Sequence, residues 1–114
     1  MSNLTKHFEK FISTYPEIAV AYETLGDAVH KQGPLDEKSR ALVKLAISAG
    51  SKMEGAVHSQ VKKALKVKLT KAEIRQVALL SIPTIGFPSA MAVLSWMDDI
   101  LDKTPIRKTK KKAK

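Results

Sequence analysis

Two residues that could carry out acid–base chemistry stand four positions apart in the middle of the chain. Glu54 and His58 would be neighbours on one helix face, because side chains at positions i and i+4 meet there. A carboxylate beside an imidazole can orient the ring and tune its transfer of protons near neutral pH. Gly55 and Ala56, between them, are small enough to let a ligand approach. The pair is therefore a candidate acid–base site.

Both residues also have a structural interpretation. Ser51 stands three residues before Glu54, which is the pattern of a helix capping box. A histidine within a helix can equally be a buried packing residue. A metal site would need at least a third ligand, and neither His7, His30 nor the remaining acids show ligand spacing. The sequence therefore predicts no metal and no cofactor.

Composition excludes several classes of function. The chain has 114 residues and no cysteine, which rules out disulfide scaffolds, iron–sulfur clusters and thiolate nucleophiles. Its length fits a single domain, which we expect over residues 1–103, followed by a disordered basic tail at 104–114. No run of 18 apolar residues and no signal-peptide core occur, so we expect a cytoplasmic protein without a membrane partner.

The positive charge is concentrated at one end. The net charge is +9, and residues 107–114 contribute six positive charges and no acid, which leaves +3 for the rest. Five more lysines cluster over residues 62–71, namely Lys62, Lys63, Lys66, Lys68 and Lys71. These residues could contact phosphate backbones, but aromatic residues make up only 5% of the chain, so no stacking platform exists. We expect at most weak, non-specific contacts with nucleic acid through the Lys-rich tail.

Helical periodicity dominates the chain, and strand patterns are nearly absent. The spacing predicts six helices, over about 4–14, 16–31, 36–50, 51–67, 70–82 and 88–101. The best-supported boundary is the start of the fifth helix. There Thr70 and Glu73 match a capping box, and Leu69 and Ile74 match a hydrophobic staple. This fifth helix is apolar on most sides, as a buried helix would be, and Pro83 should end it. The prediction is an all-α, single-domain helical bundle.

The stretch from Leu35 to Leu101 resembles the carboxymuconolactone decarboxylase and alkylhydroperoxidase-like superfamily. The resemblance is carried, in the family's order and spacing, by LDEKSRALVKLAISAG at 35–50, EGAVHSQVKKAL at 54–65 and LTKAEIRQVALLSIPTIGFPSAM at 69–91. It implies an alkylhydroperoxidase-like all-α fold. It also implies a homo-oligomer, with a hexamer as the expected assembly.

The resemblance separates two branches of the superfamily at one site. The peroxidase branch carries Cys-x-x-Cys-x-x-x-His, whose histidine corresponds to His58 and whose cysteines correspond to Ser51 and Glu54. A glutamate of that branch falls on Ala41. Because serine and glutamate cannot form the disulfide of the reduction cycle, thiol peroxidase activity is excluded. The decarboxylase branch resembles Glu-x-x-x-His here, which Glu54 and His58 match.

The leading functional hypothesis is a cofactor-free carboxy-lyase that decarboxylates a small carboxylated lactone. His58 would donate a proton to carbon, Glu54 would orient and charge-balance the imidazole, and Gly86, Phe87 and Trp96 would wall an apolar, substrate-binding pocket. No residue matches a cation for the lactone carboxylate, and Arg40 and Lys44 are the available guesses. The alternatives are a catalytically silent oligomeric scaffold with the same fold, and a weakly nucleic-acid-associated protein.

Overall fold

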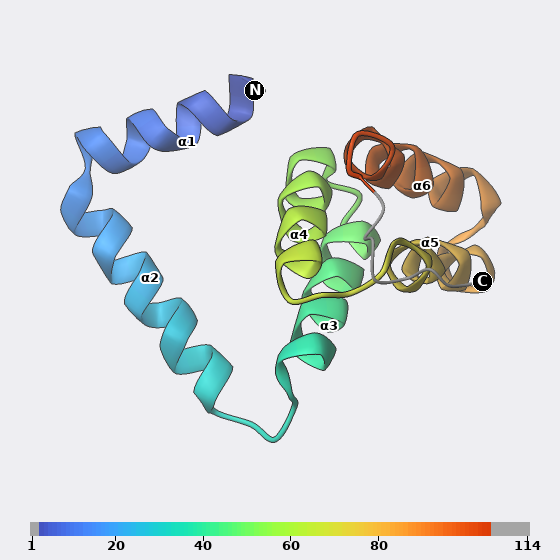
Figure 1. The fold of residues 1–114 in the computed structure, drawn as a ribbon, viewed down its shortest axis with the longest axis horizontal. Helices are drawn as coiled ribbons and strands as arrows, with labels where there is room; N and C mark the ends of the chain where they lie inside the picture. Colours follow the sequence, from blue (N-terminus) through green and yellow to red (C-terminus); the bar gives the residue numbers. More distant parts are fainter. Residues whose placement is uncertain (1–2, 106–114) are drawn as a thin grey trace. The chain divides into compact units, whose positions relative to one another are not determined.

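The computed structural model describes residues 3–105 and has only α-helices as regular elements within that range (Figure 1). The helices are α1 (Asn3–Thr14), α2 (Pro16–Lys31), α3 (Glu37–Gly50), α4 (Glu54–Lys66), α5 (Lys71–Ile85) and α6 (Phe87–Leu101). The prediction of an all-α fold with six helices is confirmed. No helix of the described range is both long and apolar enough to cross a membrane. The Lys-rich segment 107–114 lies outside the described residues.

The chain divides into two compact units, Met1–Asp36 and Glu37–Lys114. The single domain expected over residues 1–103 stays a prediction. In the first unit, Tyr15 joins the two helices: its N–H donates to the Phe11 carbonyl, its carbonyl accepts from the Ala19 N–H, and its ring lies 5.3 Å from that of Phe11. None of the α2 residues is buried, and Ile18 and Tyr22 leave more than half of their surface exposed.

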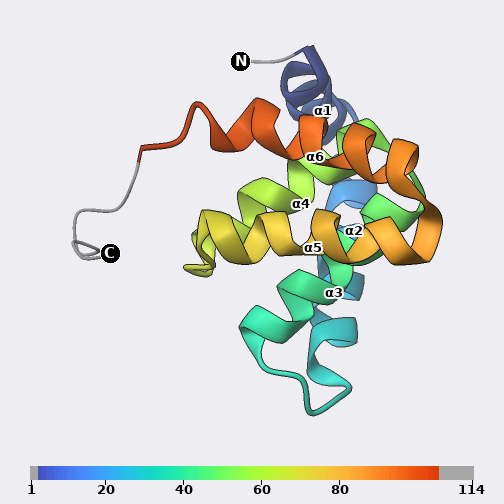
Figure 2. The same ribbon diagram turned by 90° about the vertical axis from the view of Figure 1, so that its right-hand side faces the viewer.

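The hydrophobic core belongs to the second unit. In this unit α3 and α4 form one helical hairpin and α5 and α6 form another, with α4 packed against α6 and α3 against α5 (Figure 2). The fully buried side chains come from all four helices and from the turn before α5; the largest are Leu45, Val57, Val61, Leu69, Ile74, Val93, Met97 and Leu101. Each such side chain contributes about 1.5–3 kcal/mol by leaving water.

Polar contacts fix α5 on α6. Arg75 of α5 donates from Nε to Asp98 at 2.9 Å and from a terminal nitrogen to Asp102 at 3.1 Å. Asp98 lies in the last turn of α6 and Asp102 is its C-cap residue, so a single guanidinium connects the last turn to the helix end. Asp99, which lies between them in the sequence, takes no part in these two ion pairs.

Two expectations about α5 are wrong. The helix does not stop before Pro83 but continues to Ile85, because the Gly86 N–H still donates to the Ile82 carbonyl and the missing proline N–H removes only one bond. Nor is α5 buried on most sides, since Leu79 and Leu80 are exposed. They remain in water because only α3 and α6 flank this helix closely.

An open apolar groove runs between α3 and α5. Its cavity volume is about 520 Å³, and it is lined mainly by aliphatic side chains, including Leu42, Val43, Val77, Leu80 and Ile85. Such a surface, like the exposed apolar residues of α2, is what an oligomer would bury. The homo-oligomer and its hexameric state stay predictions.

The start of α5 gives a direct stability test. The Thr70 hydroxyl accepts from the Glu73 N–H at 3.0 Å and a Glu73 carboxylate oxygen accepts from the Thr70 N–H at 2.8 Å, which confirms the predicted capping box. We expect Thr70→Ala to lower the free energy of unfolding by about 1 kcal/mol in urea titrations. Thr70→Ser keeps the hydroxyl and should remain near the wild-type value; equal losses in both variants would contradict the capping role.

A second test concerns Lys44, whose pKa is lowered by burial and then by the positive charges of Lys63 and Arg40. A lysine whose pKa falls on folding opposes folding while it is charged, so stability should rise as the pH increases from the lowered pKa towards the unfolded value. We expect Lys44→Met to raise the free energy of unfolding at neutral pH by less than about 1 kcal/mol, measured as a higher urea midpoint. The matched control is Lys62→Met, which removes an exposed lysine of α4 and should leave the urea midpoint close to the wild-type value. An unchanged or lower midpoint for Lys44→Met would contradict this account of its charge.

Candidate acid–base site

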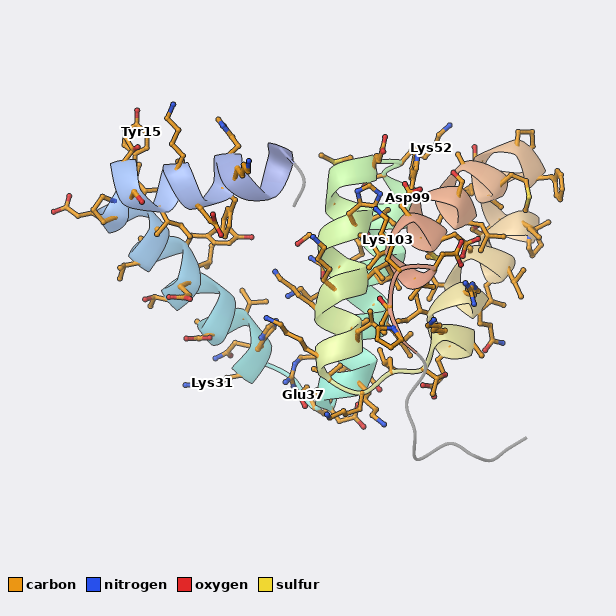
Figure 3. The ribbon with its side chains drawn as sticks, turned by 45° about the horizontal axis from the view of Figure 1, so that its top comes forward. Tyr15, Lys31, Glu37, Lys52, Asp99 and Lys103 are labelled. Atoms are coloured by element: carbon orange, nitrogen blue, oxygen red, sulfur yellow. The ribbon has the colours of Figure 1, made fainter. Side chains whose placement is uncertain are left out.

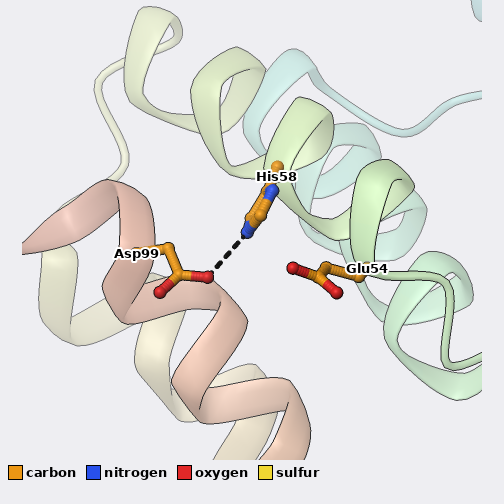
Figure 4. A group of neighbouring side chains, drawn as sticks. All are labelled: Glu54, His58 and Asp99. Carbon is orange, nitrogen blue, oxygen red and sulfur yellow. Dashed lines mark hydrogen bonds and ion pairs between the residues drawn. The ribbon is translucent and has the colours of Figure 1, made fainter. Parts of the chain in front are cut away.

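Three acid–base side chains meet between α4 and α6 (Figure 4). Glu54 is the first residue of α4 and His58 lies one turn further along the same helix. Asp99 comes from the last turns of α6, on the side that faces α4 (Figure 3). One ligating atom from each of the three residues lies within 4.8 Å of the others.

Core packing positions these residues. On α4 the buried positions are Val57, Val61 and Ala64, which follow the helical period. On α6 they include Met97 and Leu101. Asp99 lies between those two core residues, and His58 follows directly after Val57. Burial of the apolar residues therefore fixes the relative register of the two helices and brings His58 opposite Asp99.

The closest contact of the site is between His58 Nε2 and Asp99 Oδ2, at 3.0 Å. An ionised carboxylate only accepts hydrogen bonds, so Nε2 must carry the hydrogen. The His58 side chain is 23% exposed and that of Asp99 51%. The ring is thus held by a charge-assisted bond while one edge of the site remains open to solvent.

Glu54 does not have the helix-capping role that the sequence predicted. The N-cap of α4 is Met53, not Ser51, and no side chain caps this helix end. The predicted capping box of Ser51 and Glu54 is therefore wrong. The reason is that the turn after α3 runs through Lys52, at φ 56°, before α4 begins. Within the described part of the chain, the Glu54 carboxylate forms no hydrogen bond or ion pair. A negative charge at a helix N-terminus is favourable, but Glu54 is otherwise available to a ligand.

Asp99 is the residue that the sequence analysis missed. It lies 41 residues from His58 in an Asp98–Asp99 pair with no local motif. The helical period did not single it out: with Val93, Met97 and Leu101 in the core, Asp98 falls about 100° from the centre of the buried stripe and Asp99 about 160°, on the side away from it. Whether this side meets α4 depends on how the helices cross, which the sequence did not determine.

Two of the three predicted pocket residues, Gly86 and Phe87, lie apart from this cluster. Gly86 joins α5 to α6 with φ at 100°, a conformation that favours glycine, and Phe87 begins α6 with an exposed side chain. Twelve residues separate Phe87 from Asp99, about 18 Å along the helix. Trp96 lies on α6 one turn before Asp99 and packs against the core. Its role, like that of Gly86 and Phe87, stays a prediction.

The two guessed cations are on another face of the unit. Arg40 and Lys44 are on α3, and the charge that reaches Lys44 from α4 is that of Lys63. On a helix, Lys63 and His58 point in directions about 140° apart. Ala41, which corresponds to a peroxidase glutamate, is half-buried against the core. A carboxylate-binding role for Arg40 or Lys44 stays a prediction.

Comparisons with known proteins agree with the fold. The family model of the carboxymuconolactone decarboxylase family matches residues 16–99. A carboxymuconolactone decarboxylase family protein from Legionella pneumophila has a similar structure, with a TM-score of 0.69, 23% identity, and coverage of 86% of this chain and 90% of that chain. No curated protein matches the sequence significantly.

The family model spans most of the chain, including α2 through nearly all of α6, with Glu54, His58 and Asp99 inside the match. With the all-helical fold and the resemblance of residues 35–101, this establishes that the chain belongs to the carboxymuconolactone decarboxylase family.

Proposed function

We propose that this protein is a decarboxylase of a small, carboxylated, unsaturated lactone, with His58 as the proton donor. The observation that carries the proposal is the His58 imidazole, which Asp99 holds through Nε2 at 3.0 Å in a site with an open edge. Family membership supports the reaction class. Neither the reaction nor its substrate follows from the fold alone.

The reaction needs one proton delivered to carbon. When the bond to the carboxylate carbon breaks, CO₂ leaves and its bonding electrons pass into the conjugated carbonyl as an enolate. Protonation of the enolate carbon by the His58 imidazolium then completes the reaction, and the ring recovers its proton from solvent through the open edge. General acid catalysis of this kind requires the donor to reach the reacting atom directly or through one water.

Asp99 takes the orienting role that the sequence analysis gave to Glu54. The Asp99 carboxylate contacts the ring and sets its rotamer and tautomer, as a carboxylate beside a catalytic histidine does. Glu54, within 4.8 Å of the pair, adds a second negative charge beside an imidazolium. In this proposal Asp99 positions the ring and Glu54 balances its charge.

The accessibility of His58 separates the enzyme from the silent scaffold. A scaffold that had lost its site would close the space around the imidazole with packing residues. Instead, Glu54 and Asp99 are exposed and His58 is only partly covered. This openness favours a site that receives a small molecule.

The test is turnover on a panel of carboxylated unsaturated lactones, followed by CO₂ release. Removal of a general acid costs about 10²–10⁴-fold in rate, so His58→Ala should lower kcat by at least about 100-fold. Asp99→Asn, which keeps the size but not the charge, should lower kcat less, because the proton donor remains.

The matched control is His7→Ala, which removes an exposed histidine of α1 in the other unit. It should turn over substrate like the wild type. Wild-type turnover by His58→Ala would overturn the assignment of the proton donor. A panel on which the wild-type protein shows no turnover, while still binding small acids, would favour the scaffold.

A further inference from the structure

We infer that Glu54, His58 and Asp99 form a binding site for one divalent transition-metal ion, with Zn²⁺ as the best fit. The inference concerns the same side chains as the proposed function but does not depend on catalysis. It starts from a ligand that the sequence could not supply: a metal site needed a third residue beside Glu54 and His58, and α6 brings Asp99 to them.

The distances are close to those of a metal centre. Zinc binds histidine nitrogen and carboxylate oxygen at about 2.0–2.2 Å, so two ligand atoms in a tetrahedral site are about 3.4 Å apart. His58 Nε2 and Asp99 Oδ2 are already 3.0 Å apart. Every ligating pair lies within 4.8 Å, and Glu54 is exposed, so its side chain has room to turn towards an ion.

The chemistry of the donors selects the class of ion. One imidazole nitrogen and two carboxylate oxygens suit Zn²⁺ and neighbouring first-row ions, whereas Mg²⁺ and Ca²⁺ favour oxygen ligands throughout. Two carboxylates neutralise the charge of a divalent ion. Three protein ligands also leave a tetrahedral ion one position for water or a small anion, as in open zinc sites.

The Glu54 carboxylate provides a further argument. Its predicted capping role is absent, and it has no hydrogen-bonding or ionic partner in the part of the chain described. It nevertheless lies beside a paired histidine and a second acid. A bound cation would satisfy all three side chains at once and would link α4 to α6.

Metal binding and the orienting hydrogen bond to Asp99 use the same atom, Nε2. The ion would take the Nε2 lone pair in place of the hydrogen that is donated to Asp99, so the metal-bound ring and the imidazolium oriented by Asp99 are alternative states of one site. Added Zn²⁺ should therefore inhibit the proposed decarboxylation, whereas binding itself can be measured without any substrate.

The experiment is calorimetric titration of the full chain with Zn²⁺, alongside thermal unfolding at increasing Zn²⁺ concentration. We expect one ion per chain and a Tm that rises with Zn²⁺, because an ion that binds only the folded state stabilises it. Glu54→Gln, His58→Gln and Asp99→Asn should each weaken binding by at least about 10-fold, since even outer-shell partners of metal ligands matter this much. Unfolding curves recorded without metal establish that each variant is folded.

The matched control is His7→Gln, which should bind Zn²⁺ like the wild type. The inference is overturned if the wild type shows neither binding heat nor a rise in Tm. It is equally overturned if binding survives both His58→Gln and Asp99→Asn, or is lost in His7→Gln. A protein that binds Zn²⁺ but decarboxylates no lactone would contradict only the proposed function, and a protein that decarboxylates without binding Zn²⁺ would contradict only this inference.

Discussion

The packing of α4 against α6 is the constraint on which the site depends. Val57 and Val61 on one helix, and Met97 and Leu101 on the other, are fully withdrawn from water. Together their burial is worth several kcal/mol, far more than the exposed hydrogen bond between His58 and Asp99 can contribute. The apolar contacts therefore determine where the two helices lie, and the acid–base residues are positioned as a consequence.

This division between core and site explains why the acid–base residues lie outside the core although core residues flank them in the sequence. His58 directly follows a core residue of α4, and Asp99 lies between two core residues of α6. Rigid neighbours hold both backbones while the side chains remain partly open to water. Arg75 secures the other flank of α6 through Asp98 and Asp102, which leaves Asp99 to the site.

Much of the fold could be predicted from local patterns. Capping residues, helix-breaking turns and the helical period identified all six elements, and the box at Thr70 and Glu73 was found in full. Errors arose where a local pattern competed with backbone geometry: Pro83 lies inside α5 because the hydrogen-bond ladder continues around it, and Ser51 does not cap α4 because Lys52 takes a left-handed conformation before the helix starts.

Two of the three residues of the candidate site could be predicted in the same way. Glu54 and His58 share a helix, so their spacing was informative, whereas Asp99 reaches them only through tertiary packing across 41 residues. Gly86 and Phe87 were predicted as pocket residues from their local sequence alone. In the structure they lie at the opposite end of α6 from Asp99. Pairing between helices is the information that one sequence does not contain.

The central claim is that α6 presents Asp99 to the imidazole of His58. The most direct measurement is a long-range ¹H–¹⁵N NMR spectrum of the histidine rings at a pH where His58 is neutral, compared between the wild type and Asp99→Asn. The account predicts that His58 carries its hydrogen on Nε2 in the wild type, because the carboxylate can only accept, and that its ring resonances shift in the variant. A hydrogen on Nδ1 in the wild type, with ring resonances unchanged by the substitution, would contradict it.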